Sequence, residues 1–279
     1  MRMARMRTGR ESVITFTGGF HGRTADSISA TFLGKYRDIG RPNVPGHLCA
    51  EFGSIESVAA LAGAEVAAVM LEPIQSMAGV RQAAPEFYRE LRSLCDERGM
   101  LLIYDEVQTG VGRTGDWFFA GSEAGAGVVP DVVTLAKALG SGVPVGACLT
   151  TDAVAASIKE NDLGTTFGGG MLAMAAVSAT LEAVEADAML ANARALEEHL
   201  RGRLAGVSRV TGLRGRGLLL GVEFDEGVAG AVHKALLERH IITGTSSDAR
   251  VLRLLPPLCL KIDEADLFVE ALAEILPGV

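Results

Sequence analysis

Ionisable and amide side chains follow three apolar runs of the chain, at places where buried strands are expected to end. Glu72 closes the first run, Asp105 and Gln108 follow the second, and Lys137 follows the third. In an open α/β sheet, ligands bind beyond the carboxyl ends of the strands, so we expect these side chains to line one site. Glu106 points the other way along its strand and is expected to make structural hydrogen bonds only. The pattern predicts acid–base and amine chemistry at one edge of a sheet.

Lys137 precedes the glycine-rich stretch ALGSGVP, which places its amine beside a flexible turn. In a partly desolvated cleft, a lysine amine has a lowered pKa and can attack a carbonyl carbon. If Asp105 faced this amine from a neighbouring strand, the pair would suit pyridoxal phosphate. The lysine would form the Schiff base, and the carboxylate would keep the ring nitrogen protonated. An aspartate here is also commonly a helix N-cap or a loop residue, and the spacing alone leaves that alternative open.

The elements expected to position these residues alternate between strands and helices. Phe87, Leu91 and Leu94 recur at spacings of four and three, ahead of Gly99, which predicts a helix over 85–99. Strands are expected at 12–16, 66–72, 100–107, 131–136 and 145–151. Such an alternation indicates an α/β fold with a mostly parallel, doubly wound sheet sandwiched by helices.

The composition changes after about residue 170, where alanine-rich helices begin. An apolar run over 217–224 and a closing amphipathic helix then indicate a small α+β domain. We therefore expect a large domain over 1–175 and a small C-terminal domain over 176–279. The stretch GLRGRG at 212–217 is interpreted as a turn, since three of its residues are glycines.

The overall composition excludes several classes of function. The chain has 279 residues, is 48% hydrophobic and carries a net charge of −8, so it can bury a large core and is a poor match for nucleic acid. Its apolar runs are too short for a membrane span, and its basic start lacks the apolar core of a secretory signal, so a cytoplasmic location is expected. The four cysteines are widely spaced, which predicts buried thiols and no metal or disulfide site.

Six motifs together resemble the class III pyridoxal-phosphate-dependent aminotransferases, most closely the acetylornithine/ornithine aminotransferase branch. In chain order they are GGFHGRT, LEPIQ, DEVQTGVGRTG, TLAKALGSGVPVGA, GTTFGG and VLRLLPPL. Their order and spacing match the family across nearly the whole chain. The resemblance implies the pyridoxal-phosphate transferase fold of type I, with a smaller C-terminal α+β domain.

The resemblance also implies roles for the residues that hold the cofactor. Lys137 would be the Schiff-base lysine and the proton shuttle. Asp105 would pair with the pyridine nitrogen, Gln108 would hydrogen-bond the ring oxygen beside the aldehyde, and Phe20 would stack on the ring. Thr166 would reach the cofactor phosphate of the opposite subunit, which implies an obligate homodimer.

Substrate contacts follow from the same resemblance. Arg253 would grip the α-carboxylate, for which a planar bidentate guanidinium is well suited. Arg23 and Thr165 match positions that contact the acyl-ornithine side. Glu72 would lie near the cofactor, supporting Gln108 or the ring, although a plain strand-end carboxylate is an equal alternative. The expected reaction moves an amino group from an N-acetylornithine-like or ornithine-like amino acid to 2-oxoglutarate by a ping-pong route.

Three departures from the family pattern bear on activity. The family carries an N-terminal region with a glycine turn that cradles the cofactor phosphate, whereas MRMARMRTGR resembles only the end of its helix, so we expect an N-terminally truncated member. Met77 stands where many ornithine and γ-aminobutyrate relatives have glutamate, which favours an alanine–glyoxylate-type or other α-amino specificity. Gly170 and Met171 replace an Asn-Pro pair. A decarboxylase or mutase on this scaffold, and an inactive homologue, are further alternatives.

Overall fold

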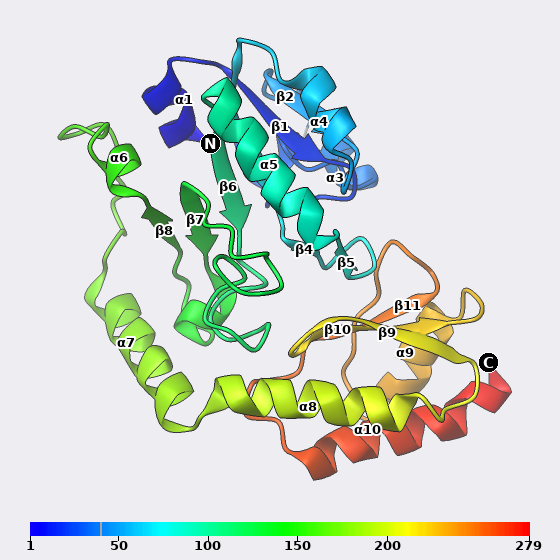
Figure 1. The fold of residues 1–279 in the computed structure, drawn as a ribbon. Coiled ribbons are helices and arrows are strands. Elements are labelled where there is room, and N and C mark those ends of the chain that lie inside the picture. The colour runs from blue at the N-terminus through cyan, green and yellow to red at the C-terminus, as the bar shows by residue number, and fades with distance from the viewer. Residues whose placement is uncertain (40) are drawn as a thin grey trace. The chain divides into compact units, whose positions relative to one another are not determined.

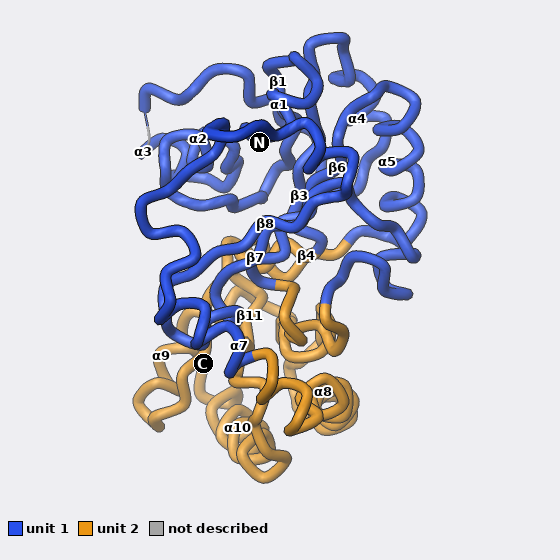
Figure 2. The backbone as a smooth tube through the Cα atoms, turned by 90° about the vertical axis from the view of Figure 1, so that its left-hand side faces the viewer, with its two compact units in different colours: residues 1–73, 83–108, 118–180 blue, residues 74–82, 109–117, 181–279 orange. Residues whose placement is uncertain are grey.

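The computed structural model describes residues 1–39 and 41–279 and divides the chain into two compact units (Figure 2). Unit 1 comprises residues 1–73, 83–108 and 118–180. Unit 2 comprises residues 74–82, 109–117 and 181–279. Each unit has its own sheet. No helix in the described part of the chain is long and apolar enough to cross a membrane.

Unit 1 is built on a six-stranded sheet with the order β2-β1-β3-β6-β7-β8 (Figure 1). Its strands are β1 (Ser12–Phe16), β2 (His47–Ala50), β3 (Val66–Leu71), β6 (Leu101–Asp105), β7 (Val132–Leu135) and β8 (Ala147–Thr150). All neighbours are parallel except β7 and β8, which are antiparallel. Every residue of β3 is buried, as expected for a strand covered on both faces. The predicted mostly parallel α/β sheet is therefore confirmed.

Unit 1 also contains helices, several of which contact strands of this sheet. They are α1 (Arg2–Thr8), α2 (Ala25–Ser29), α3 (Lys35–Ile39), α4 (Ile55–Leu61), α5 (Pro85–Arg98), the 3-10 helix η1 (Lys137–Gly140), α6 (Asp152–Ala155) and α7 (Met171–Ala186), the last of which runs past the end of unit 1. Helix α5 packs on β6 and buries Phe87 and Leu91, and it ends at Gly99 with φ 61°. The helix predicted over 85–99 is confirmed.

Unit 2 has a three-stranded antiparallel sheet in the order β11-β10-β9, with three helices packed around it (Figure 1). Its elements are β9 (Val210–Arg216), β10 (Leu219–Phe224), β11 (Val251–Leu254), α8 (Met189–Leu204), α9 (Ala229–Glu238), α10 (Ile262–Ile275) and the short η2 (Leu276–Gly278). The hairpin of β4 (Ile74–Gln75) and β5 (Arg81–Gln82) also belongs to this unit. The core includes Leu200, Leu220 and Leu272.

The interpretation of 212–217 as a turn was wrong, because all but the last of these residues lie in β9. The glycines serve close packing within a hairpin: a Cβ on Gly215 would overlap the Leu219 carbonyl, and one on Gly217 would lie 2.5 Å from the Arg113 carbonyl oxygen. Arg214 is held by an ion pair with Glu223 on β10. The glycines made this stretch resemble a turn in the sequence. In the structure they are required because neighbouring backbone groups crowd these positions, and not because the chain reverses there.

The expectation of four buried thiols was also wrong. Cys95 is buried in α5 and Cys49 is half-buried, but Cys148 and Cys259 are exposed. Cys148 lies on β8, which is the edge strand of its sheet, and Cys259 lies in the turn that precedes α10. Spacing in the sequence says nothing about which strand forms the edge.

Candidate active site

The carboxyl ends of three adjacent strands bring the predicted catalytic residues of unit 1 to one edge. Strands β3, β6 and β7 are neighbours, with Leu71 beside Tyr104 and Asp105 beside Thr134. Glu72 directly follows β3, Asp105 ends β6, and the lysine at position 137 comes two residues after β7. Parallel alignment of the strands therefore gathers groups that are far apart in the sequence.

Asp105 is a buried carboxylate, 6% exposed, with donors on both oxygens. Its Oδ2 lies 2.8 Å from Nδ1 of His21, and its Oδ1 accepts hydrogen bonds from Val107 N at 3.2 Å and Thr134 Oγ1 at 3.3 Å. Burial lowers the pKa of His21, but the hydrogen bond and the charge of Asp105 outweigh it, so the pKa of His21 is raised overall. The contact with Asp105 thus favours the imidazolium form of His21.

Glu72 is the second buried carboxylate of this edge, 3% exposed. Its Oε1 accepts a hydrogen bond of 2.8 Å from the backbone N–H of Phe20. Burial raises the pKa of Glu72 to about 7, against the opposing charges of His21 and Lys137. This side chain therefore supports the loop that carries Phe20, and it can hold a proton near neutral pH.

The loop before α2 carries the candidate residues Phe20 and Arg23 together with His21, and hydrogen bonds hold it in place. Besides the bond to Phe20 N, the backbone N–H of His21 donates to Thr31 Oγ1 at 2.9 Å. The Phe20 ring meets Tyr36 edge-to-face at 5.3 Å, and the guanidinium of Arg23 lies 5.4 Å from the centre of the same Tyr36 ring. Phe20 and Arg23 are thus linked through one aromatic side chain.

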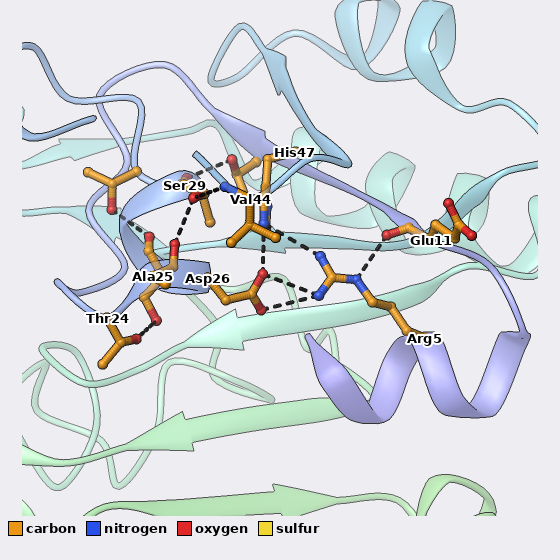
Figure 3. A network of polar contacts seen from close by, with 12 residues as sticks. Arg5, Glu11, Thr24, Ala25, Asp26, Ser29, Val44 and His47 are labelled. Atoms are coloured by element: carbon orange, nitrogen blue, oxygen red, sulfur yellow. Dashed lines mark hydrogen bonds and ion pairs between the residues drawn. The ribbon is translucent and has the colours of Figure 1, made fainter. Parts of the chain in front are cut away.

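A polar network holds α2, the helix that follows this loop (Figure 3). Both oxygens of Asp26 accept bonds of 3.2 Å from Arg5, and Oδ1 lies 2.8 Å from His47 Nε2. Arg5 also donates to the Glu11 carbonyl at 2.9 Å. Although burial raises the pKa of Asp26, the His47 and Arg5 contacts lower it overall. The network connects α1, α2 and β2, and it fixes the far end of the candidate loop.

Lys137 begins η1 with a φ of 48°, in the left-handed region. This conformation costs a non-glycine residue on the order of 1–3 kcal/mol and is concentrated at functional sites. The side chain is exposed, and its positive charge reaches Glu72, whose pKa it lowers. This exposure differs from the partly desolvated cleft that the sequence predicted for the amine, whereas the interaction with Glu72 agrees with its predicted place at the strand ends.

The remaining predicted residues lie apart from this group. Gln108 is half-buried in the turn after β6. Thr165 and Thr166 are exposed in the segment before α7, and within the described residues no hydrogen bond joins them to Asp105 or Glu72.

Arg253 lies on β11 in unit 2, where its backbone pairs with Gly244 on one side and Gly221 on the other. Its Nε donates to the Thr245 carbonyl at 2.6 Å and its Nη1 to Ser76 Oγ at 2.9 Å. The arginine is thus held in a defined orientation inside its own unit.

Sequence reasoning missed several supporting residues. Thr31, Thr134 and Tyr36 gave no signal, since their partners are distant in the chain. The pairing of His21 with Asp105 was missed for the same reason, since 84 positions separate the two residues. Glu106 has the structural role expected of it: its oxygens accept the N–H groups at positions 119 and 120, at 2.7 and 2.8 Å.

Comparison with known proteins places this geometry in a family. The family described as Aminotransferase class-III matches residues 1–276. The acetylornithine aminotransferase of Archaeoglobus fulgidus is 40% identical over 270 residues, covering 97% of this chain and 70% of the relative. That of Agrobacterium fabrum is 43% identical over 258 residues, covering 91% of this chain and 63% of the relative. The chain therefore spans about two thirds of the length of these relatives.

Solved structures agree with the sequence matches. The ornithine aminotransferase of Toxoplasma gondii, whose active site is partially occupied by pyridoxal phosphate, superposes with a TM-score of 0.88 at 29% identity, over 98% of this chain and 68% of that one. A transaminase from the marine bacterium Virgibacillus gives a TM-score of 0.91 at 25% identity, over 99% and 71% of the two chains. The expected type I fold is confirmed, and the chain belongs to the class III aminotransferases, a family of pyridoxal-phosphate-dependent transaminases.

Proposed function

We propose that this protein transfers an amino group from an N-acetylornithine-like or ornithine-like amino acid to 2-oxoglutarate by a ping-pong route. The observation that carries the proposal is the group of Lys137, Glu72, Asp105 and His21 at adjacent strand ends of unit 1. The donor class is taken from relatives that are acetylornithine aminotransferases.

The residues of this edge fit pyridoxal phosphate. A carboxylate has about four acceptor positions, and Asp105 uses three of them on described residues, so it can accept one more bond from a ring N–H. His21 Nε2 is buried and has no hydrogen-bond partner among the described residues, which marks a polar position next to the group. When bound, the cofactor supplies an electron sink for the carbon that loses its proton.

Each residue then has a defined task. Lys137 would bind the cofactor covalently, and its amine, once displaced by the amine of the substrate, would carry the proton from the substrate α-carbon to the cofactor. Asp105 would hold the proton of the ring nitrogen, and the imidazolium of His21 would keep that carboxylate ionised. Phe20 would cover a ring face, in a position set by its bond to Glu72. Gln108 would bind the ring oxygen, for which the support is the family resemblance alone.

Substrate recognition is assigned to residues outside this core group. Arg253 would bind the α-carboxylate of the amino acid and of the 2-oxo acid through a bidentate contact. Arg23, stacked on Tyr36, and Thr165 would contact the side of the substrate that carries the acyl or ω-amino group. The cytoplasmic location remains a prediction.

A second copy of the chain is proposed as the partner. The segment around Thr166 and the start of α7 expose large apolar side chains: Phe167 is 88% and Met171 is 90% exposed. Leu172 continues this exposed surface. Apolar patches of this kind mark interfaces, and Thr166 lies within it, as expected for a residue that reaches the opposite subunit. Sedimentation should show a dimer that Met171→Asp dissociates; a monomeric parent protein would refute this part.

Met77 supports a second candidate, an α-amino specificity of the alanine–glyoxylate type. Its backbone carbonyl accepts the Ser247 N–H at 2.9 Å, so a neutral side chain is fixed next to Ser76, the partner of Arg253. Glutamate formation from 2-oxoglutarate with N-acetylornithine, ornithine or alanine as donor separates the two candidates. Release of carbon dioxide without glutamate would indicate a decarboxylase instead.

An absorbance titration with pyridoxal phosphate tests the central claim. The parent protein should develop a visible band that depends on the bond to Lys137, and the Lys137→Ala variant should lack that band while keeping its far-UV circular dichroism. Lys159→Ala, which removes another exposed lysine of unit 1, serves as the matched control. If the parent forms no such band, or if the band persists in Lys137→Ala, the proposed function is wrong for this chain.

A further inference from the structure

Ser76 is a fully buried residue on the β4–β5 hairpin of unit 2, 0% exposed. Two backbone contacts fix this hairpin: Ser247 N donates to the Met77 carbonyl at 2.9 Å, and Arg214 Nη1 donates to the Gly79 carbonyl at 3.2 Å. The hydroxyl of Ser76 therefore occupies a defined position and cannot drift with a flexible loop.

The Arg253 guanidinium meets this hydroxyl with one nitrogen and the Thr245 carbonyl with another, at 2.9 Å from Nη1 and 2.6 Å from Nε. Two bonds from different nitrogens of one planar group fix both the position and the rotation of the plane. Gly244 leaves room for this guanidinium, because a Cβ at that position would lie 3.4 Å from Nη2. Of these two acceptors, Thr245 provides a backbone carbonyl and Ser76 provides a side-chain hydroxyl. Ser76 lies in a segment that is far from Arg253 in the sequence.

We propose that Ser76 is a positioning residue for Arg253, so that the pair sets the plane in which the guanidinium receives the carboxylate of the amino acid and of the 2-oxo acid. The inference rests on the proposed role of Arg253 and extends it to a residue of a separate segment. Ser76 does not touch the substrate. It acts by keeping the fork of the guanidinium in one orientation before the carboxylate arrives, which reduces the entropy lost on binding.

The test is the dissociation constant of 2-oxoglutarate for the cofactor-loaded protein, measured by titration calorimetry. Ser76→Ala should weaken binding about five- to tenfold, because a hydrogen bond to a charged group is lost. Ser76→Thr, which keeps the hydroxyl, should restore most of the affinity. Ser122→Ala is the control, since the Ser122 hydroxyl donates to Phe119 O at 2.7 Å and accepts from Gly125 N at 3.2 Å, in a loop segment that carries no proposed site residue.

A double-mutant cycle separates positioning from general loosening of the unit. In an Arg253→Ala background, Ser76→Ala should weaken binding no further, because its effect passes through the arginine. An additive effect in that background, or an unchanged affinity in Ser76→Ala while Arg253→Ala weakens binding, would overturn the inference and leave the proposed function standing. If Arg253→Ala itself binds 2-oxoglutarate as tightly as the parent, the role proposed for Arg253 is wrong, and the inference falls with it.

Discussion

Replacing Glu72 with glutamine is expected to stabilise the protein at alkaline pH and to leave its stability near pH 5 almost unchanged. Burial raises the pKa of Glu72 from 4.5 to about 7, so the folded protein keeps a proton that the unfolded chain has released. Because the unfolded state binds fewer protons in this interval, the free energy of unfolding falls as the pH rises from 4.5 to about 7 and then levels off.

The magnitude follows from the size of that interval. At about 1.4 kcal/mol per pH unit, ionising Glu72 costs the folded state about 3 kcal/mol above pH 7. Glutamine has no charge to bury, and its amide oxygen can still accept the Phe20 N–H that now bonds Glu72 Oε1. The variant should therefore gain up to about 3 kcal/mol at pH 8 relative to the parent.

Urea unfolding of the cofactor-free protein between about pH 5 and pH 8 measures this difference. His21 also titrates in both proteins; its raised pKa contributes stability that is complete below its ordinary pKa of 6.5 and is lost as the pH rises through the folded value. Because Asp105 raises this pKa more than the charge of Glu72 does, most of the His21 contribution is common to the parent and the variant. Glu90→Gln, which removes a charge from an exposed position on α5, is the control and should show no such pH dependence. A Glu72→Gln variant that is equally stable or less stable than the parent at every pH would refute the reasoning.

Three further changes test other parts of the structure. Gly217→Ala should destabilise unit 2 by at least about 1–3 kcal/mol, because residue 217 has φ 55° and a Cβ there would crowd the Arg113 carbonyl; thermal unfolding measures it, and an unchanged melting temperature would contradict the hairpin geometry. Glu106→Ala should lower the free energy of unfolding by about 2–4 kcal/mol, since the N–H groups of Phe119 and Ala120 lose their acceptor. Hydrogen exchange should accelerate at these two positions and not elsewhere. His21→Gln should weaken pyridoxal phosphate binding about tenfold or more, as measured by fluorescence titration, while leaving the far-UV circular dichroism unchanged; equal affinity would show that the buried imidazolium is not needed.

The sheet of unit 1 was largely predictable, because buried parallel strands are nearly continuous apolar runs. The run at 66–72 predicted β3, and strand-end placement then brought Glu72 and Asp105 together. Strand β2 was not predicted, since half of its residues are only partly buried and its apolar pattern is weak. An apolar pattern over a few residues indicates a buried strand. It does not reveal an edge strand such as β2, which is only partly buried.

Partners of the site residues were harder to predict than the residues themselves. The sequence placed Glu72 near Gln108 or the ring, and the structure shows a bond from Phe20 N to its carboxylate. His21, which appears in the sequence only within the motif GGFHGRT, meets Asp105 across 84 positions of the chain. Such contacts depend on how a loop folds over strand ends, which no local periodicity records.

The division of unit 2 among three stretches of chain has a consequence for how the protein is made. A fragment that starts at residue 181 would lack Val80, whose side chain packs directly against Gly221. It would also lack the Arg113 carbonyl that accepts the Leu218 N–H. On the ribosome, the segments 74–82 and 109–117 emerge early and must wait for the last third of the chain before their core can close. Expression of residues 181–279 as a separate piece is therefore expected to yield an aggregating product.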